Sequence, residues 1–248
     1  MAPVATPASV TPAVISSLKA SFAAEQPSYA PTTLIDVLSY AAERYPSHEL
    51  NFITSSAHDS SIQTKTFTSF NQSVRNLARA LTELNKPAGS IILVYLTEHE
   101  DNMAAVWACL LAGYVPCLQP ALSAQQAHKE AHIAHITNVT RSVTWLTSEA
   151  GADQVRSIPG LEIHLLSELR IAAEGYSVSA DWVARTVQPD DEAIFFLTSG
   201  SSGFSKVVVH THRTILAACA SKGIAYGLTS ESNILNCESL YVLAILSI

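Results

Sequence analysis

AIFFLTSGSSGFSKVVVHTH, residues 193–212, is the stretch with the strongest structural signal in the sequence. The bulky apolar run Ile194–Leu197 leads into Thr-Ser-Gly-Ser-Ser-Gly, and a lysine, Lys206, is followed by three valines. Continuous apolar runs of this kind are typical of strands that are covered on both faces of a sheet. The pattern therefore predicts two buried strands, over 193–197 and 206–210, with the small residues between them.

The rest of the chain alternates between amphipathic segments and apolar runs. Apolar residues with helical spacing, such as Phe70, Val74 and Leu77, are followed by a continuous apolar run over 90–96. This alternation with short links is typical of an α/β fold with a largely parallel sheet flanked by helices. We expect helices over 33–45, 69–84, 100–111, 123–138 and 214–226, a short extended piece over 66–68, and further strands over 90–96, 114–118, 142–146 and 161–165.

Composition restricts the partners and the location. The 248 residues carry a formal net charge of −7, which argues against nucleic acid and against an anionic membrane as partners. No apolar run reaches the length of about 18 residues that a membrane span needs. Residues 1–30 are rich in Ala, Pro, Ser and Thr and lack a signal-peptide pattern, so we expect a flexible leader. Widely spaced cysteines favour reduced thiols and a cytoplasmic location: Cys109, Cys117, Cys219 and Cys237.

The loop between the two predicted strands is the main candidate for a ligand site. A flexible Gly/Ser turn is the simpler alternative, but strands on both sides favour a fixed loop. The P-loop pattern fails because Val207 follows the lysine, and the nucleophile-elbow pattern fails because Phe204 replaces its last glycine. Consecutive N–H groups in a Gly-rich turn nevertheless bind anions, and hydroxyls and a cation strengthen that binding. We expect a phosphate site formed by Thr198, Ser199, Gly200, Ser201, Ser202, Gly203 and Lys206.

A second candidate pattern is a group of histidines in the segment 123–138. His128, His132 and His135 lie at positions i, i+4 and i+7, which places them on one face of a helix. Such spacing suits zinc or nickel, but no fourth ligand lies nearby in the sequence. We favour the alternative, a polar face of the helix turned toward solvent, and we expect no protein-bound metal site.

The loop and two upstream segments together resemble the adenylate-forming superfamily, which includes acyl-CoA synthetases, luciferases and nonribosomal-peptide-synthetase (NRPS) adenylation domains. Residues 198–206 with Thr211-His212-Arg213 resemble the phosphate-loop signature of these enzymes. Residues 66–81 resemble their early helix, and AVWACLLAGYVPCLQP, residues 105–120, resembles their Ala-Gly-to-Pro segment. The similarity extends over about 31–236 and in style is closest to fungal NRPS-like synthetases.

The resemblance implies the first part of an adenylate-forming N-terminal domain and a reaction. The enzyme would join a small carboxylic acid to ATP, with Mg²⁺, and pass the acyl group to coenzyme A or to the phosphopantetheine of a carrier domain. Residues 198–203 would wrap the β and γ phosphates, and Lys206 would be the catalytic cation that offsets their charge. His212 would have a structural role near the loop.

The sequence departs from the family pattern in two places. Val207 replaces the glycine that usually follows the lysine, and the sequence after Asn236 no longer follows the family. We expect residues 31–248 to be an incomplete adenylation domain with an aberrant tail from about 237, without the later catalytic motifs. This favours a truncated chain without full activity. The alternative is a genuine short relative that is a non-catalytic nucleotide-binding or regulatory fragment.

Overall fold

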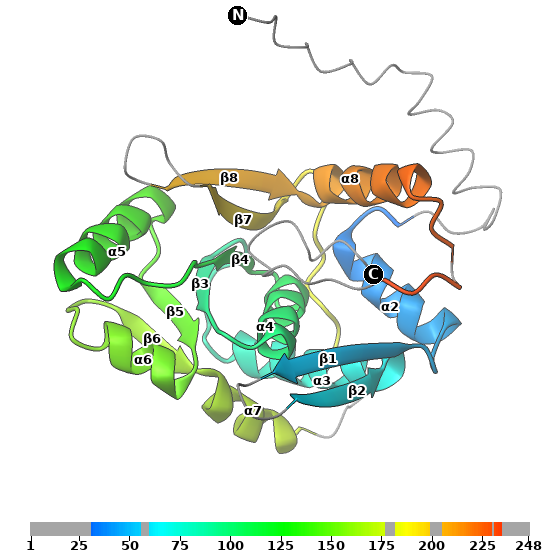
Figure 1. Ribbon diagram of the computed structural model, residues 1–248, viewed down its shortest axis with the longest axis horizontal. Helices are drawn as coiled ribbons and strands as arrows, with labels where there is room; N and C mark the ends of the chain where they lie inside the picture. Colours follow the sequence, from blue (N-terminus) through cyan, green and yellow to red (C-terminus); the bar gives the residue numbers. More distant parts are fainter. Residues whose placement is uncertain (1–30, 56–59, 177–181, 199–204, 230, 235–248) are drawn as a thin grey trace, which may run out of the picture.

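A six-stranded, mostly parallel sheet forms the centre of the computed structural model, which describes residues 31–55, 60–176, 182–198, 205–229 and 231–234 (Figure 1). The strand order is β6-β5-β3-β4-β7-β8, and only β8 runs antiparallel to its neighbour. The α/β prediction is therefore confirmed. The strands are β3 Ile91–Tyr95, β4 Val115–Leu118, β5 Thr144–Thr147, β6 Glu162–Leu165, β7 Glu192–Thr198 and β8 Lys206–Thr211. The expected leader (1–30) and the expected aberrant tail lie outside the described residues.

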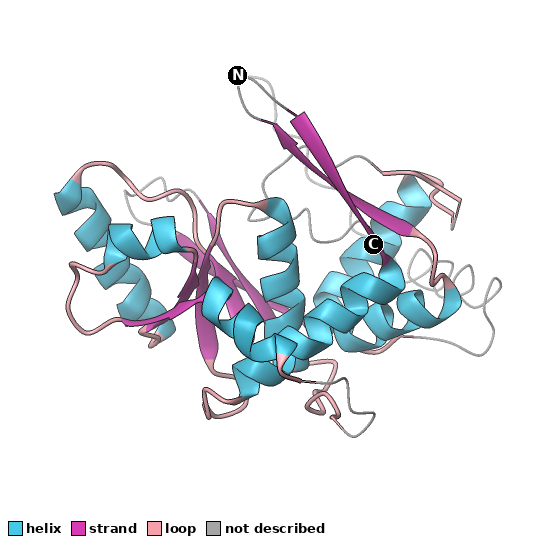
Figure 2. Cartoon of the chain, turned by 90° about the horizontal axis from the view of Figure 1, so that it is seen from below, coloured by secondary structure: helices cyan, strands magenta, loops and turns pink. Residues whose placement is uncertain are grey.

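Helices cover both faces of this sheet, as Figure 2 shows. Alternate residues of each strand enter different cores: Ile92 and Val94 of β3 contact the helices of one layer, and Leu93 contacts those of the other. One layer contains α2 Leu34–Arg44, α3 Phe67–Thr82, α4 His99–Leu111 and α7 Leu166–Glu174. The other contains α5 Gln126–Thr140 and α6 Glu149–Val155. Helix α8, His212–Ala225, reaches the first core through Ile215.

The segment around Thr66 differs from the expectation of an isolated extended piece. Thr66 ends a hairpin of β1 Glu49–Ser55 and β2 Ser60–Thr66, which pair antiparallel. Its side chain then accepts a hydrogen bond from the Ser69 N–H and so caps α3. The sequence did not reveal the hairpin because β2 is almost entirely polar. The short helices α6 and α7 were also not predicted.

The prediction that 206–210 is a buried strand is wrong. β8 lies at the edge of the sheet, where Val208 and Val209 keep 36% and 46% of their surface exposed. β7 is buried from Ala193 to Phe196, as expected. A run of three valines satisfies the strand pattern equally well at an edge and at a centre, so the sequence alone could not distinguish them.

The carboxyl ends of β3, β4, β5 and β7 meet at one edge of the sheet because these strands are parallel. Neighbouring ends are joined there: the Thr147 hydroxyl donates to the carbonyl of Tyr95 at 2.7 Å. The connections from β3 and β4 leave toward opposite faces, through α4 and α5. In open α/β sheets, ligands bind at such a point outside the carboxyl ends. No helix in the described part of the chain is both long and apolar enough to cross a bilayer.

We predict that Gly151→Ala destabilises this edge. A Cβ at Gly151 in α6 would lie 2.1 Å from Thr147 Oγ1, so the hydroxyl that joins β5 to β3 must move. Overpacking of this kind costs about 1–3 kcal/mol of unfolding free energy, measurable by urea denaturation. The matched control is Gly223→Ala in α8, where a Cβ meets open space and helix propensity predicts a gain of up to ~1 kcal/mol. Equal effects of the two changes would contradict the packing described here.

Candidate functional site

Two of the predicted phosphate-site residues lie at the tip of the β7–β8 hairpin. Thr198 is the last residue of β7, Lys206 is the first of β8, and the two are directly paired in the ladder. The Thr198 hydroxyl also lies 3.5 Å from the Lys206 carbonyl, to which it donates. The remaining predicted residues, Ser199, Gly200, Ser201, Ser202 and Gly203, lie outside the described residues. The hairpin therefore brings the two ends of the Gly-rich segment together at the carboxyl edge of the sheet.

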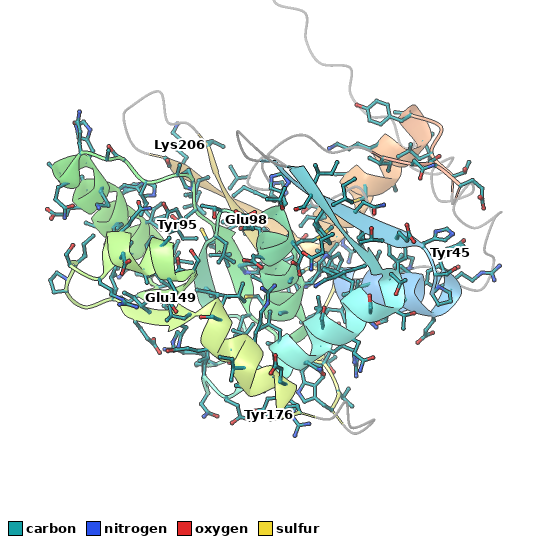
Figure 3. All side chains as sticks on the ribbon, turned by 60° about the horizontal axis from the view of Figure 1, so that its bottom comes forward. Tyr45, Tyr95, Glu98, Glu149, Tyr176 and Lys206 are labelled. Atoms are coloured by element: carbon teal, nitrogen blue, oxygen red, sulfur yellow. The ribbon has the colours of Figure 1, made fainter. Side chains whose placement is uncertain are left out.

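The chemical character of this tip suits an anionic ligand. Thr198 and Lys206 are both exposed, so a hydroxyl and an ammonium group face solvent side by side. Figure 3 shows Lys206 at the end of the hairpin, on the same side of the molecule as Tyr95 and Glu98, which lie at and beyond the end of β3. A lysine on a flexible stem can approach a phosphate as a point charge, and the Thr198 hydroxyl can donate to a phosphate in place of its long bond to the Lys206 carbonyl.

His135 of α5 contacts the hairpin directly. Its Nε2 lies 2.8 Å from the backbone carbonyl of Ser205, the residue before Lys206. A carbonyl can only accept, so Nε2 carries the proton. Figure 1 likewise shows α5 beside the end of the β7–β8 hairpin. Sequence reasoning missed this contact because the two residues are 70 positions apart.

His132 links the same helix to the end of β4. Its Nε2 lies 3.4 Å from Oε1 of Gln119, a buried side chain whose amide NH₂ donates to the Cys117 carbonyl at 3.1 Å. Since the amide nitrogen is used in this way, the Gln119 oxygen accepts from His132. Burial, together with the charge of His135, lowers the pKa of His132, which favours its neutral form.

The expectation that the three histidines form a solvent-exposed face is therefore wrong for two of them. His128 is exposed, whereas His132 and His135 are half-buried beside Ile133 and Ile136, the residues of α5 that enter the core. When the apolar residues of a helix pack against a sheet, the histidines next to them also come close to the sheet. In the part of the chain that the structure describes, no group of three or more His, Cys, Asp or Glu residues could hold a metal ion.

His212 lies at the opposite end of β8 from the loop. It is six positions after Lys206, or roughly 20 Å at the rise of an extended chain. It is 1% exposed, and its Nδ1 accepts from the Leu34 N–H at 3.2 Å, which joins the starts of α8 and α2. The structure thus gives His212 a structural contact, and it places this residue at the end of β8 that lies away from Lys206.

A cavity of about 290 Å³ also lies away from the loop. It is at the amino edge of the sheet, lined among others by Gly89, Gly113, Arg185, Asp191 and His212. The Arg185 guanidinium lies over the Tyr114 ring and donates to the Lys86 carbonyl, so this side chain is engaged in packing. The described part of the site is therefore the open carboxyl edge and does not include this cavity.

The comparisons with known proteins agree with this fold. Residues 38–245 match the family described as AMP-binding enzyme, and the chain belongs to that family. It is 84% identical over 236 residues to atromentin synthetase invA1 of Paxillus involutus. This alignment covers 95% of this chain and 25% of that protein. It is 68% identical over 206 residues to inactive atromentin synthetase invA3 of the same fungus, covering 83% of this chain and 21% of that one. The chain thus spans about a quarter of the length of the curated relatives it matches.

A solved structure shows the same fold at lower identity. An adenylation domain of a keto acid-selecting NRPS module, bound to keto acyl adenylate, aligns with a TM-score of 0.68 and 24% identity over 82% of this chain and 37% of that chain. At this identity the likeness concerns the fold alone. The resemblance to the adenylate-forming superfamily and to fungal NRPS-like synthetases, expected from the sequence, is confirmed.

We predict that His212 makes folding less favourable as the pH falls from about 7 to 5. Burial lowers the pKa of His212, and the nearby Asp191 and Asp36 only partly oppose this. Histidines of the unfolded chain titrate near pH 6.5, so in this window the unfolded chain binds a proton that the folded chain does not bind. The free energy of unfolding therefore decreases as the pH is lowered from 7 to 5. His212→Asn retains an acceptor for Leu34 without titrating. The pH dependence of its unfolding free energy should be flatter than that of the parent.

The control for this measurement is His128→Asn, a change on the exposed part of α5. It measures the effect of replacing a histidine with asparagine outside the core. A slope in His212→Asn as steep as in the parent would show that His212 does not contribute.

Proposed function

We propose that this chain forms the part of an adenylate-forming enzyme that holds the triphosphate of ATP. The observation that carries the proposal is the position of Thr198 and Lys206, paired at the ends of a Gly-rich segment on the carboxyl edge of the sheet. Backbone N–H groups of such a segment suit phosphate oxygens, and only glycine allows so close an approach. Ser199, Gly200, Ser201, Ser202 and Gly203 are proposed as the rest of this site.

The proposed reaction explains why a cation belongs there. A carboxylate oxygen of the acid attacks the α-phosphorus of ATP, and the bond to the β-phosphate oxygen breaks. The products are an acyl-adenylate and pyrophosphate, and negative charge accumulates on the leaving group. Lys206 stabilises that charge, an interaction that strengthens toward the transition state. Mg²⁺ enters as part of the MgATP substrate, since it is usually held through phosphates and water.

The relatives suggest the wider context of the reaction. We propose that the chain belongs to an enzyme of atromentin formation, because the protein with 84% identity is named an atromentin synthetase. In the whole protein the acyl group would pass to a thiol, either coenzyme A or the phosphopantetheine of a carrier domain. Overall identity in this region does not decide activity, because a relative named inactive is still 68% identical.

A second candidate is a nucleotide-binding chain without ligase activity. The observation that favours it is that a relative with 68% identity over 206 residues is named inactive. Exchange of labelled pyrophosphate into ATP, measured with a panel of simple carboxylic, 2-keto and amino acids, separates the two. Acid-dependent exchange that Lys206→Ala abolishes supports the ligase. Binding of MgATP without exchange supports the nucleotide-binding chain, and the absence of both contradicts the two candidates.

We predict that Lys206→Ala weakens binding of magnesium pyrophosphate to the 248-residue chain by about 10-fold or more, measured by isothermal titration calorimetry. A hydrogen bond to a charged group contributes about 1.5–3 kcal/mol, and about 1.4 kcal/mol corresponds to a factor of ten. Lys222→Ala is the matched control, because Lys222 is an exposed lysine in the last turn of α8. Equal affinities of the two variants would rule out Lys206 as a phosphate contact.

A further inference from the structure

The start of β8 receives little support from the core of the sheet. Lys206 is exposed, Ser205 and Val207 are only partly buried, and Val208 and Val209 face solvent. β8 also has a strand neighbour, β7, on one side only. The direction of the Ser205–Lys206 peptide therefore depends on a few local hydrogen bonds.

His135 supplies one of these bonds from outside the hairpin. Its Nε2–H donates to the Ser205 carbonyl at 2.8 Å, within the ordinary range for a nitrogen donor. That carbonyl belongs to the peptide whose nitrogen is Lys206, so holding the oxygen holds the plane of the peptide. The orientation of this peptide in turn sets the direction in which the Lys206 side chain leaves the backbone.

His135 itself rests on a rigid base. Ile133 and Ile136 of α5 are 1% and 0% exposed and pack into the core beneath the helix. His132, one turn before His135, reaches Gln119 at the carboxyl end of β4. The Gln119 backbone N–H donates to the Val94 carbonyl at 2.9 Å, so this residue is held by β3 as well. α5 is thus tied to the central strands and presents the imidazole of His135 in a defined place.

We propose that His135 is a positioning residue for the phosphate site: it fixes the Ser205 carbonyl and thereby directs Lys206 toward the phosphates. This inference rests on the proposed function, because it requires Lys206 to contact the ligand. His135 acts through Lys206 and makes no contact of its own with the phosphates in this role. Its effect on binding should therefore depend on whether Lys206 is present.

A double-mutant cycle on the 248-residue chain tests this dependence, with binding of magnesium pyrophosphate as the readout. We expect His135→Ala to weaken binding about fivefold, the equivalent of one neutral hydrogen bond. In the Lys206→Ala background the same change should alter binding by less than about twofold. His135→Gln retains a donor near the position of Nε2 and should bind within about twofold of the parent. His128→Gln on the same helix is the control and should bind as the parent does.

The outcomes separate this proposal from the proposed function. If Lys206→Ala leaves binding unchanged, the proposed phosphate site fails, and the positioning role fails with it. If Lys206→Ala weakens binding but His135→Ala has no effect, or has the same effect in both backgrounds, the site stands and the positioning role is overturned. Loss of binding in His135→Gln as large as in His135→Ala also overturns it. Because glutamine preserves the donor, this variant keeps the test decisive where His135→Ala fails to fold.

Discussion

The parallel pairing of β3, β4, β5 and β7 is the constraint on which the proposed site depends. Parallel strands end on the same edge, so Tyr95, Gln119, Thr147 and Thr198 gather there from distant parts of the sequence. The antiparallel return of β8 is equally necessary, because it places the beginning of that strand, and with it Lys206, on the same edge. A parallel β8 would place Lys206 at the opposite edge.

The two sides of this edge differ in how firmly they are supported. β3 and β4 are buried on both faces by α4 and α5. The Gln119 side chain joins the end of β4 to His132 of α5, and the Thr147 hydroxyl joins the end of β5 to Tyr95 of β3. β8 lies on the exposed side, where packing is weak. A site between β4 and β8 therefore has well-packed strands on one side, and on the other side the Lys206 cation, which few contacts hold in place. The hydrogen bond from His135 of α5 to the Ser205 carbonyl is important because it joins the exposed start of β8 to the well-packed side.

At the opposite, amino edge a carboxylate joins several elements. Glu162 is partly buried, which by itself raises the pKa of its carboxyl, but hydrogen bonds from Lys86, Thr144 and His164 outweigh this and lower the pKa to about 2. The carboxylate therefore stays ionised at neutral pH and holds β5 and β6 to the segment before β3. The Glu162 carboxylate at the amino edge is thus bonded to side chains of this chain, whereas Thr198 and Lys206 at the carboxyl edge face solvent.

Local periodicity was sufficient to predict most of the fold. The apolar spacing of Phe70, Val74 and Leu77 located α3, and the continuous runs in β3 and β7 located central strands. The hairpin β1–β2 was not predictable because its second strand is polar and is held by backbone pairing. The exposure of Val208 and Val209 was not predictable either, because it depends on the position of β8 in the sheet order.

For the site, short-range chemistry pointed to Thr198 and Lys206, which the structure places side by side. It could not supply His135, whose partner Ser205 is 70 residues distant, or the buried amide of Gln119 that holds His132. It also could not supply the contact of His212 with Leu34, which is 178 positions away in the sequence. Contacts between elements set these positions, and periodicity within one element carries no information about them.

Proton NMR of the histidine ring resonances during a titration with magnesium pyrophosphate tests the central claim most directly, because histidines lie at both edges of the sheet. If the phosphates bind at the carboxyl edge, the ring signals of His132 and His135 should shift with saturation, while that of His212, at the amino edge, stays in place. A shift confined to His212, or no shift at any ring, would contradict the placement of the phosphate site at the β7–β8 hairpin.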